Sequence, residues 1–448
     1  MKAYRKLVRQ LNGAGLGYES PGRFGMNIRK GYYPVSVTEY ETLREKSACL
    51  LSVLEKVNRI YSVALKKNDK ETLSFFESGI LKERGMRKLH RRLFREQGMR
   101  MPETFRTDTP DLKQFLEFHV GLRGLGIVCA QRAGMEEHFG CDEVFNKVRI
   151  KLFSRRFGFL SMKKGERGIY LQRTKKTGEE RFFLKEAFFL GEERMEEKKD
   201  ESILLFGNKD RGREVFFGVS AKDVYRRLLK RRNIFPSEWF KREDFSIKKL
   251  ITGKTLIEPP PNLLYEQKMV LSAVYSPRFK GVFSDKERKI FPETYVLEKE
   301  KMMEFADGFY TLEDVINMPG NKRRFMIKYA GLDFSLNWGG RGVYRLAFKT
   351  REQSRRIVEQ AVFAYERYKE PWIIQPDLSC REEAVFYDTE KDLFREKTMY
   401  RVFRPYFIRG KEAPEAEVID IQVLSRDFYK VHCVKGAVSG LVCLKNDG

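Results

Sequence analysis

The sequence is poor in the residues that build several common kinds of site. Four histidines in 448 residues are too few for a His-rich metal centre. The six cysteines are scattered and form no C-x-x-C pair, so neither a zinc site nor a disulfide framework is indicated. No apolar run reaches about 18 residues, which predicts no membrane span, and reduced thiols suit a cytoplasmic protein. A G-x-x-x-x-G-K-[ST] phosphate loop and a catalytic triad are also missing.

Positive charge is what the chain has in excess. Lys and Arg number 88 against 63 Asp and Glu, which gives a formal net charge of +25. Such a field attracts polyanions, including nucleotides, nucleic acid, acidic peptides and anionic membranes, without choosing among them. A basic but solvated surface is the simpler explanation for most of these charges. Because 42% of the residues are hydrophobic and 13% aromatic, we expect a folded core.

Hydrophobic periodicity predicts an α+β protein with mixed, mostly antiparallel sheets. A long helix is expected over 35–66, beginning at a capping box of Thr38 and Glu41. The expected helices that follow are 81–100, 221–232, 262–275 and 351–369. The expected strands are 113–120, several within 147–220, and 324–329, 342–348, 371–376, 384–388, 399–408 and 418–423. Residues 190–201, which are highly charged, are expected to be a linker or an exposed loop.

A phosphate-binding loop is predicted where a strand ends in Lys328. The segment that follows is rich in glycine and small polar residues: Gly331, Ser335, Asn337, Gly339, Gly340 and Gly342. A triphosphate needs a cation and close backbone N–H groups, and glycine permits that approach because it has no Cβ. The alternative is a glycine-rich hairpin with a surface lysine.

Two further segments add to a nucleotide site. Lys268 follows the rigid Pro259-Pro260-Pro261 segment and lies in the first turns of an expected helix, where a solvated lysine is the alternative. Gln375 lies on the expected strand 371–376, whose directional hydrogen bonds could recognise an adenine edge. The alternative for this strand is ordinary burial.

Acidic residues much earlier in the chain suggest a metal site. Glu117 and His119 share one face of a strand, because side chains alternate with a period of two. Asp108 on a neighbouring strand would complete a hard oxygen site for Mg²⁺, and Arg106 would hold a phosphoryl oxygen. The alternative is a solvated hairpin with a charged outer face.

Taken in order, these segments resemble the ATP-grasp superfamily in its circularly permuted branch, typified by the synthetase domain of glutathionylspermidine synthase. In that branch the metal-binding strands precede the two nucleotide lysines. The same order occurs here: Arg106, Asp108, Glu117, His119, Lys268, Lys328 with its Gly-rich loop, and Gln375. The turn GLRGLG at 121–126, the segment 291–294 and the strand 400–407 are also similar, so the resemblance spans roughly residues 30–440.

The resemblance implies an ATP-dependent carboxylate–amine ligase that works through an acyl-phosphate with ATP and Mg²⁺. Lys268, Lys328 and Gln375 would contact the nucleotide, and Ser335, Gly339, Gly340 and Gly342 would belong to a loop over the triphosphate. Asp108, Glu117 and His119 would hold the metal. Arg106 would face the acyl-phosphate and would act together with Lys328 as a catalytic residue at the transferring phosphoryl group. The implied segments are an N-terminal helical region (1–105), metal-binding strands with a substrate lobe (106–250) and nucleotide-binding lobes (251–448).

One residue departs from the family pattern. His119 stands where the family has asparagine, and imidazole suits Mg²⁺ less well than an amide oxygen. The departure leaves open a second function, in which a degenerate ATP-grasp scaffold serves as a basic binding protein for nucleic acid or an acidic partner. For the ligase, the expected partners are a small-molecule or peptide carboxylate and an amine. Nucleic acid is the less favoured partner, and no membrane is expected.

Overall fold

The structure is a computed structural model, and it describes the larger part of the chain. The described residues are 1–13, 25–80, 84–97, 101–102, 104–120, 125–139, 145, 169–172, 195–198, 204–208, 213–217, 255–258, 262–333, 336, 341–410, 415–431 and 436–445. They form helices and mixed sheets, so the α+β class expected from periodicity is confirmed.

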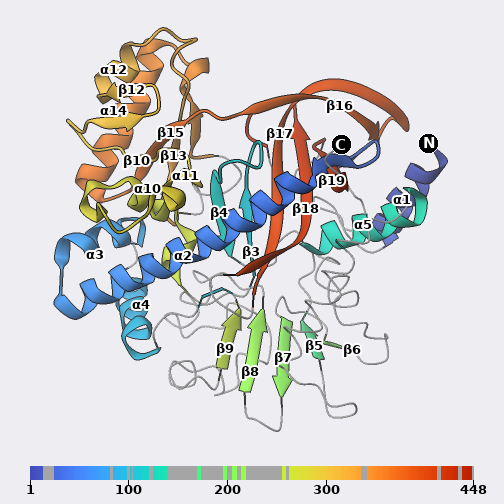
Figure 1. Ribbon diagram of the computed structural model, residues 1–448, viewed down its shortest axis with the longest axis horizontal. Helices are drawn as coiled ribbons and strands as arrows, with labels where there is room; N and C mark the ends of the chain where they lie inside the picture. Colours follow the sequence, from blue (N-terminus) through green and yellow to red (C-terminus); the bar gives the residue numbers. More distant parts are fainter. Residues whose placement is uncertain are drawn as a thin grey trace.

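An eight-stranded sheet forms the centre of the molecule (Figure 1). Its order is β16-β1-β19-β18-β17-β3-β4, and β2 also pairs with β19. The strands are β1 Asn27–Arg29, β2 Tyr33–Ser36, β3 Thr104–Asp108, β4 Glu117–Val120, β16 Cys380–Asp388, β17 Leu393–Arg409, β18 Ala416–Arg426 and β19 Val438–Lys445. The 17-residue β17 pairs with β16 along its first half and with β18 and β3 along its second half. The three expected segments, 1–105, 106–250 and 251–448, therefore all contribute strands to this one sheet.

Helix α2 (Val37–Lys67) runs across one face of this sheet (Figure 1). Its buried residues, among them Leu50 and Leu54, share a core with Phe105 of β3 and Phe407 of β17. The helix begins two residues earlier than its expected capping box. Ser36 and Glu39 form the capping box, so the expected pair of Thr38 and Glu41 is wrong. Ser36 ends β2 in an extended conformation and is therefore the last residue before the helical turn.

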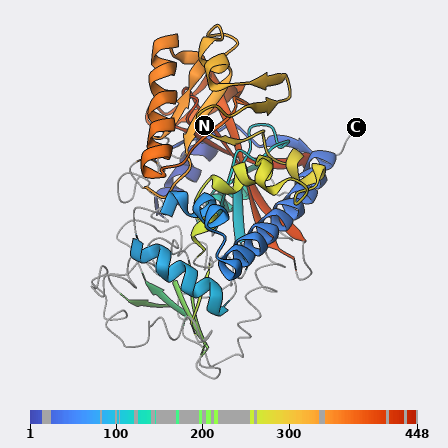
Figure 2. The ribbon, with the colours of Figure 1, turned by 90° about the vertical axis from the view of Figure 1, so that its left-hand side faces the viewer.

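A smaller four-stranded sheet carries the second lysine segment. Its order is β10-β15-β13-β14, with β10 Tyr295–Val296, β13 Phe325–Tyr329, β14 Val343–Arg345 and β15 Trp372–Pro376. Helices α12 (Leu312–Asn317) and α14 (Arg351–Tyr368) pack against the face that carries Phe325, Ile327 and Tyr329. Figure 2 shows α14 standing beside these strands. Lys328 alternates with those residues and therefore lies on the opposite face.

The remaining described elements surround the two sheets. The helices are α1 Lys2–Gly13, α3 Lys70–Glu77, α4 Arg84–Gln97, α5 Leu125–Phe139, α10 Met269–Tyr275 and α11 Asp285–Lys289. A hairpin joins β11 (Met303–Phe305) to β12 (Gly308–Tyr310). Below the large sheet in Figure 1 lies a five-stranded sheet of order β6-β5-β7-β8-β9. Its strands are β5 Ile169–Gln172, β6 Met195–Lys198, β7 Leu204–Asn208, β8 Arg213–Phe217 and β9 Thr255–Glu258.

Several expected elements differ from the structure. The charged segment 190–201 contains strand β6, because Met195–Lys198 pair in parallel with β5, so a linker is wrong there. The expected strand 113–120 is reduced to β4, since the backbone N–H of Phe115 turns away to donate to the carbonyl of Ile290. The expected strand 342–348 is reduced to β14, and Leu346–Phe348 continue as a 3₁₀ turn. The expected helix 221–232 lies outside the described residues.

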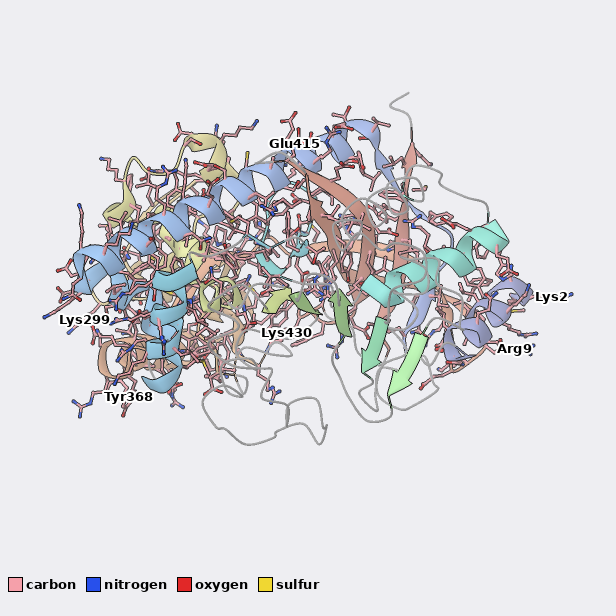
Figure 3. All side chains as sticks on the ribbon, turned by 90° about the horizontal axis from the view of Figure 1, so that it is seen from below. Lys2, Arg9, Lys299, Tyr368, Glu415 and Lys430 are labelled. Atoms are coloured by element: carbon pink, nitrogen blue, oxygen red, sulfur yellow. The ribbon has the colours of Figure 1, made fainter. Side chains whose placement is uncertain are left out.

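The positive charges are distributed over the molecule. Figure 3 places Lys2 and Arg9 at one end of the long axis and Lys299 at the other. Several surface arginines have carboxylate partners close by, as in the pairs Arg355–Glu313 and Arg278–Glu71. Within the described part of the chain, no helix is long and apolar enough to cross a membrane.

Candidate ATP and metal site

Strands β3 and β4 bring the early candidate residues together. Asp108 pairs with Glu117 and Arg106 pairs with His119 in an antiparallel register. Paired residues of neighbouring strands point to the same face, so all these side chains lie on one side of the sheet. The alternating residues Phe105 and Phe118 point to the other side, into the core under α2.

Three of these side chains form a compact group of possible metal ligands. One ligand atom each from Asp108, Glu117 and His119 lies within 4.8 Å of the others. Nε2 of His119 is 3.0 Å from Oε1 of Glu117. Asp108 is only 6% exposed, and its Oδ1 accepts no hydrogen bond from the described residues. Nε of Arg106 and Nε of Arg404 lie 3.3 and 3.4 Å from that oxygen as ion-pair partners.

Lys268 reaches this group from another part of the chain. It precedes α10 as the N-cap residue, after a 3₁₀ turn at Leu263–Glu266, and so lies just before the helix rather than within its first turns. Its backbone N–H donates to the carbonyl of Ala330 at 3.0 Å, which fixes it beside the end of β13. Its Nζ lies 3.3 Å from Oε2 of Glu117.

Gly79 lies in contact with the segments that carry Lys268 and Lys328, and no other residue fits at its position. A Cβ added to Gly79 would lie 2.6 Å from Oε1 of Gln267 and 2.7 Å from Cα of Gly331. The backbone of 78–80 therefore approaches both lysine segments too closely for a side chain at this position. This contact holds the residues before Lys268 against those after Lys328.

Lys328 is buried in the middle of the small sheet. It is 8% exposed, so the alternative of a surface lysine is wrong. Its side chain makes no hydrogen bond or ion pair with any residue that the structure describes. Burial lowers the pKa of Lys328 from 10.5 to about 8, although the neighbouring charge of Glu117 acts in the opposite direction. A buried cation that forms no direct ion pair with a described residue is costly, and an anionic ligand would reduce that cost.

The charges on the two sheets affect one another. Burial would raise the pKa of Glu117, but Lys268, His119 and Lys328 outweigh that effect and hold it well below its usual value. Glu117 is therefore ionised at neutral pH. Electrostatic coupling between Glu117 and Lys328 also shows that the site draws on both the large and the small sheet, from residues far apart in sequence.

The remaining predicted residues have mixed outcomes. Gln375 is fully buried; its Nε2 donates to Oγ1 of Thr294 at 2.7 Å, and its Oε1 has no partner among the described residues. Lys328 pairs with Ile373, which lies two residues before Gln375 on β15. Because side chains alternate along a strand, Gln375 and Lys328 lie on the same face of the sheet. A Cβ on Gly342 would lie 2.6 Å from Cβ of Tyr329, so glycine is required there. Ser335, Gly339 and Gly340 lie outside the described residues.

The structure adds a residue that the sequence interpretation left without a role. Arg404 of β17 is buried and lies beside Asp108, with Nη2 3.4 Å from Oδ2. The available signal was a charged residue on the same face of the strand as the apolar or aromatic residues Val402 and Tyr406. The site thus combines carboxylates and an imidazole, which suit a divalent cation, with lysines and arginines, which suit phosphates.

Comparisons with known proteins concern the fold. No protein-family model matches the sequence, and no curated protein matches it either. Among solved structures, the chain is similar to a glutathione synthetase-like effector from Globodera pallida in its apo form. The TM-score is 0.50 at 11% sequence identity, and the match covers 99% of this chain and 96% of that chain. At this identity the likeness shows a shared fold and nothing about activity.

Proposed function

We propose that this chain binds ATP with a divalent cation between its eight-stranded and four-stranded sheets and uses the ATP to ligate a carboxylate to an amine. The observation that carries the proposal is Lys328, which is buried, forms no ion pair with a described residue and is affected by the nearby charge of Glu117. A nucleotide triphosphate would balance the excess of lysine and arginine charge over carboxylate charge in the site. Asp108 and Glu117 would hold the divalent cation, which would supply positive charge for the phosphates.

The proposed arrangement is that of a circularly permuted ATP-grasp enzyme. Its metal-binding residues, at 106–119, precede the lysines at 268 and 328. The likeness in fold to a glutathione synthetase-like effector supports an ATP-grasp-like architecture. In this proposal 1–105 is a mainly helical support that also adds β1 and β2 to the large sheet, 106–250 supplies metal ligands and a substrate lobe, and 251–448 holds the nucleotide.

Asp108, Glu117 and His119 fit a divalent cation by their chemistry. Two are carboxylates, and Asp108 Oδ1 is a buried acceptor without a hydrogen bond from the described residues. When bound, the cation would neutralise negative charge on the phosphates as the phosphoryl group is transferred. Lys268 and Lys328 would hold the phosphates, Gln375 would lie near the adenine, and Gly342 would belong to the loop with Ser335, Gly339 and Gly340.

The reaction would proceed in two displacements. A carboxylate oxygen of the substrate attacks the γ-phosphorus, the bond to the ADP oxygen breaks, and an acyl-phosphate forms. The amine nitrogen then attacks the acyl carbon, inorganic phosphate leaves, and the nitrogen loses a proton. Arg106 and Arg404 would stabilise the oxygens of the transferred group, since guanidinium donors match phosphoryl geometry.

The test combines binding and turnover. Calorimetric titration with a non-hydrolysable ATP analogue should show binding to the wild type and none to a Lys268→Ala/Lys328→Ala variant. Phosphate release should then be assayed against pools of amino acids and short peptides. Glu117→Gln should lose turnover and keep analogue binding, because it removes a metal ligand and leaves the lysines in place, whereas exposed Glu300→Gln should change neither.

Two results would count against the ligase. Equal analogue affinity for the wild type and the double variant would remove the lysines from the site. Binding of RNA without any binding of the analogue would favour the basic scaffold protein instead.

A further inference from the structure

We infer that the divalent cation held by Asp108, Glu117 and His119 is a transition-metal ion, taken up in preference to Mg²⁺. The inference rests on the proposed nucleotide site and specifies its cofactor. It starts from the donor set, which contains a nitrogen ligand in place of a third oxygen ligand.

The chemistry of the ligands discriminates between the ions. Mg²⁺ requires near-ideal octahedral oxygen coordination and loses its waters reluctantly. Imidazole nitrogen is instead a good ligand for first-row transition metals, and affinities rise from Mn²⁺ along the series for nitrogen and oxygen sites. With two carboxylates present and phosphate oxygens expected, Mn²⁺ is the ion of this class that also tolerates a mainly oxygen environment.

The geometry places the imidazole where it can act as a ligand. His119 lies on the same face as Asp108 and Glu117, and its Nε2 is 3.0 Å from Oε1 of Glu117. One of its ring nitrogens belongs to the group of ligand atoms that all lie within 4.8 Å of one another. Among the other described histidines, His90 is buried between Tyr61 and Asn262, and His138 lies on α5.

The surrounding charges determine when the ion can enter. Lys268 is an ion-pair partner of Glu117, while Arg106 and Arg404 are partners of Asp108. Lys328 also affects Glu117 electrostatically. These cationic side chains would repel the divalent metal ion unless negatively charged phosphates bound together with it. We therefore expect tight metal binding only together with the nucleotide.

The experiment uses the full-length protein, a non-hydrolysable ATP analogue and Mn²⁺ as a spectroscopic probe. Electron spin-echo envelope modulation on the ternary complex should show coupling to a directly bound nitrogen. That coupling should change when the protein is labelled with ¹⁵N-histidine and should be lost in His119→Asn. His138→Asn is the matched control and should retain the signal.

A competition titration gives the second readout. In the wild type, the Mg²⁺ concentration that displaces half of the bound Mn²⁺ should be about tenfold or more above that for His119→Asn, because loss of a direct ligand should cost at least as much affinity as loss of a residue that only supports one. Equal displacement in both proteins, or no histidine-dependent coupling, would overturn the inference.

Analogue binding, followed separately by fluorescence, separates the two levels of the proposal. If the analogue and Mn²⁺ bind without histidine coupling, the inference alone fails and the nucleotide site stands. If the analogue does not bind to the wild type, the proposed function fails and the inference fails with it.

Discussion

At the scale of single residues, Lys328 allows stability and the proposed nucleotide binding to be tested together. Its ammonium group is buried and forms no ion pair with a described residue, which costs stability, and an anionic ligand would offset that cost. Lys328→Met should lower analogue affinity by roughly 10- to 100-fold, because a charge-assisted hydrogen bond contributes about 1.5–3 kcal/mol. It should also raise the free energy of unfolding of the nucleotide-free protein by about 1 kcal/mol.

Calorimetry and urea unfolding measure the two effects, and the exposed Lys322→Met is the control for loss of charge. A variant that is less stable and binds the analogue as tightly as the wild type would show that Lys328 has a purely structural role.

The pKa of Lys328 also predicts a pH dependence of binding. Because burial lowers it to about 8, the side chain is mostly protonated below pH 8 and becomes neutral above it. The facing groups are Glu117, Lys268, Asp108 and Asp377. Phosphates favour the protonated form, so analogue affinity should fall as pH rises above 8, by up to about tenfold per pH unit for one proton. Titrations from pH 7 to 9.5 test this, and Lys328→Met should give a much flatter profile.

At the scale of secondary-structure elements, the beginning of α2 offers a direct test of local structure. Ser36 caps the helix by accepting a hydrogen bond from the N–H of Glu39, while Thr38 is exposed inside the first turn. Ser36→Ala should lower the free energy of unfolding by about 1 kcal/mol, and Thr38→Ala by less than about 0.5 kcal/mol. Urea unfolding of both variants distinguishes the two capping positions; a larger effect at Thr38 would contradict the structure.

At the scale of the whole molecule, one buried ion pair joins early and late parts of the chain. Arg132 of α5 contacts both carboxylate oxygens of Asp420 on β18 at 2.6 Å, and both side chains are completely buried. Although burial opposes it, Asp420 raises the pKa of Arg132 above its usual value. Asp420→Asn should destabilise the protein by about 3–5 kcal/mol, because it leaves a buried charge unpaired.

The double variant Arg132→Met/Asp420→Leu serves as the control, since apolar side chains of similar volume often replace a buried pair without loss. It should recover most of the stability in thermal unfolding. If both variants unfold equally easily, the pair contributes through packing and not through charge compensation.

Local features of this protein follow from the sequence because they depend on neighbouring residues. The two-residue period of a strand is sufficient to put Glu117 and His119 on one face, and helical periodicity is sufficient to identify α2 and α14. Even so, local preference chose the wrong cap for α2 and missed β6, whose charged residues pair with β5. Pairing of β2 with β19 keeps Ser36 in the strand up to the start of the helix, and pairing with β5 makes Met195–Lys198 a strand.

The environment of the site follows only from the tertiary structure. The apolar residues around Lys328 indicate a buried strand, but they do not show that the lysine side chain itself is enclosed, and burial is what lowers its pKa. Arg404 meets Asp108 only because β17 pairs with β3, and Lys268 meets Glu117 only because its backbone is bound to Ala330. These contacts join residues that are hundreds of positions apart or lie on separate elements. Sequence determined which side chains were available, whereas packing of the sheets decided which charges face one another.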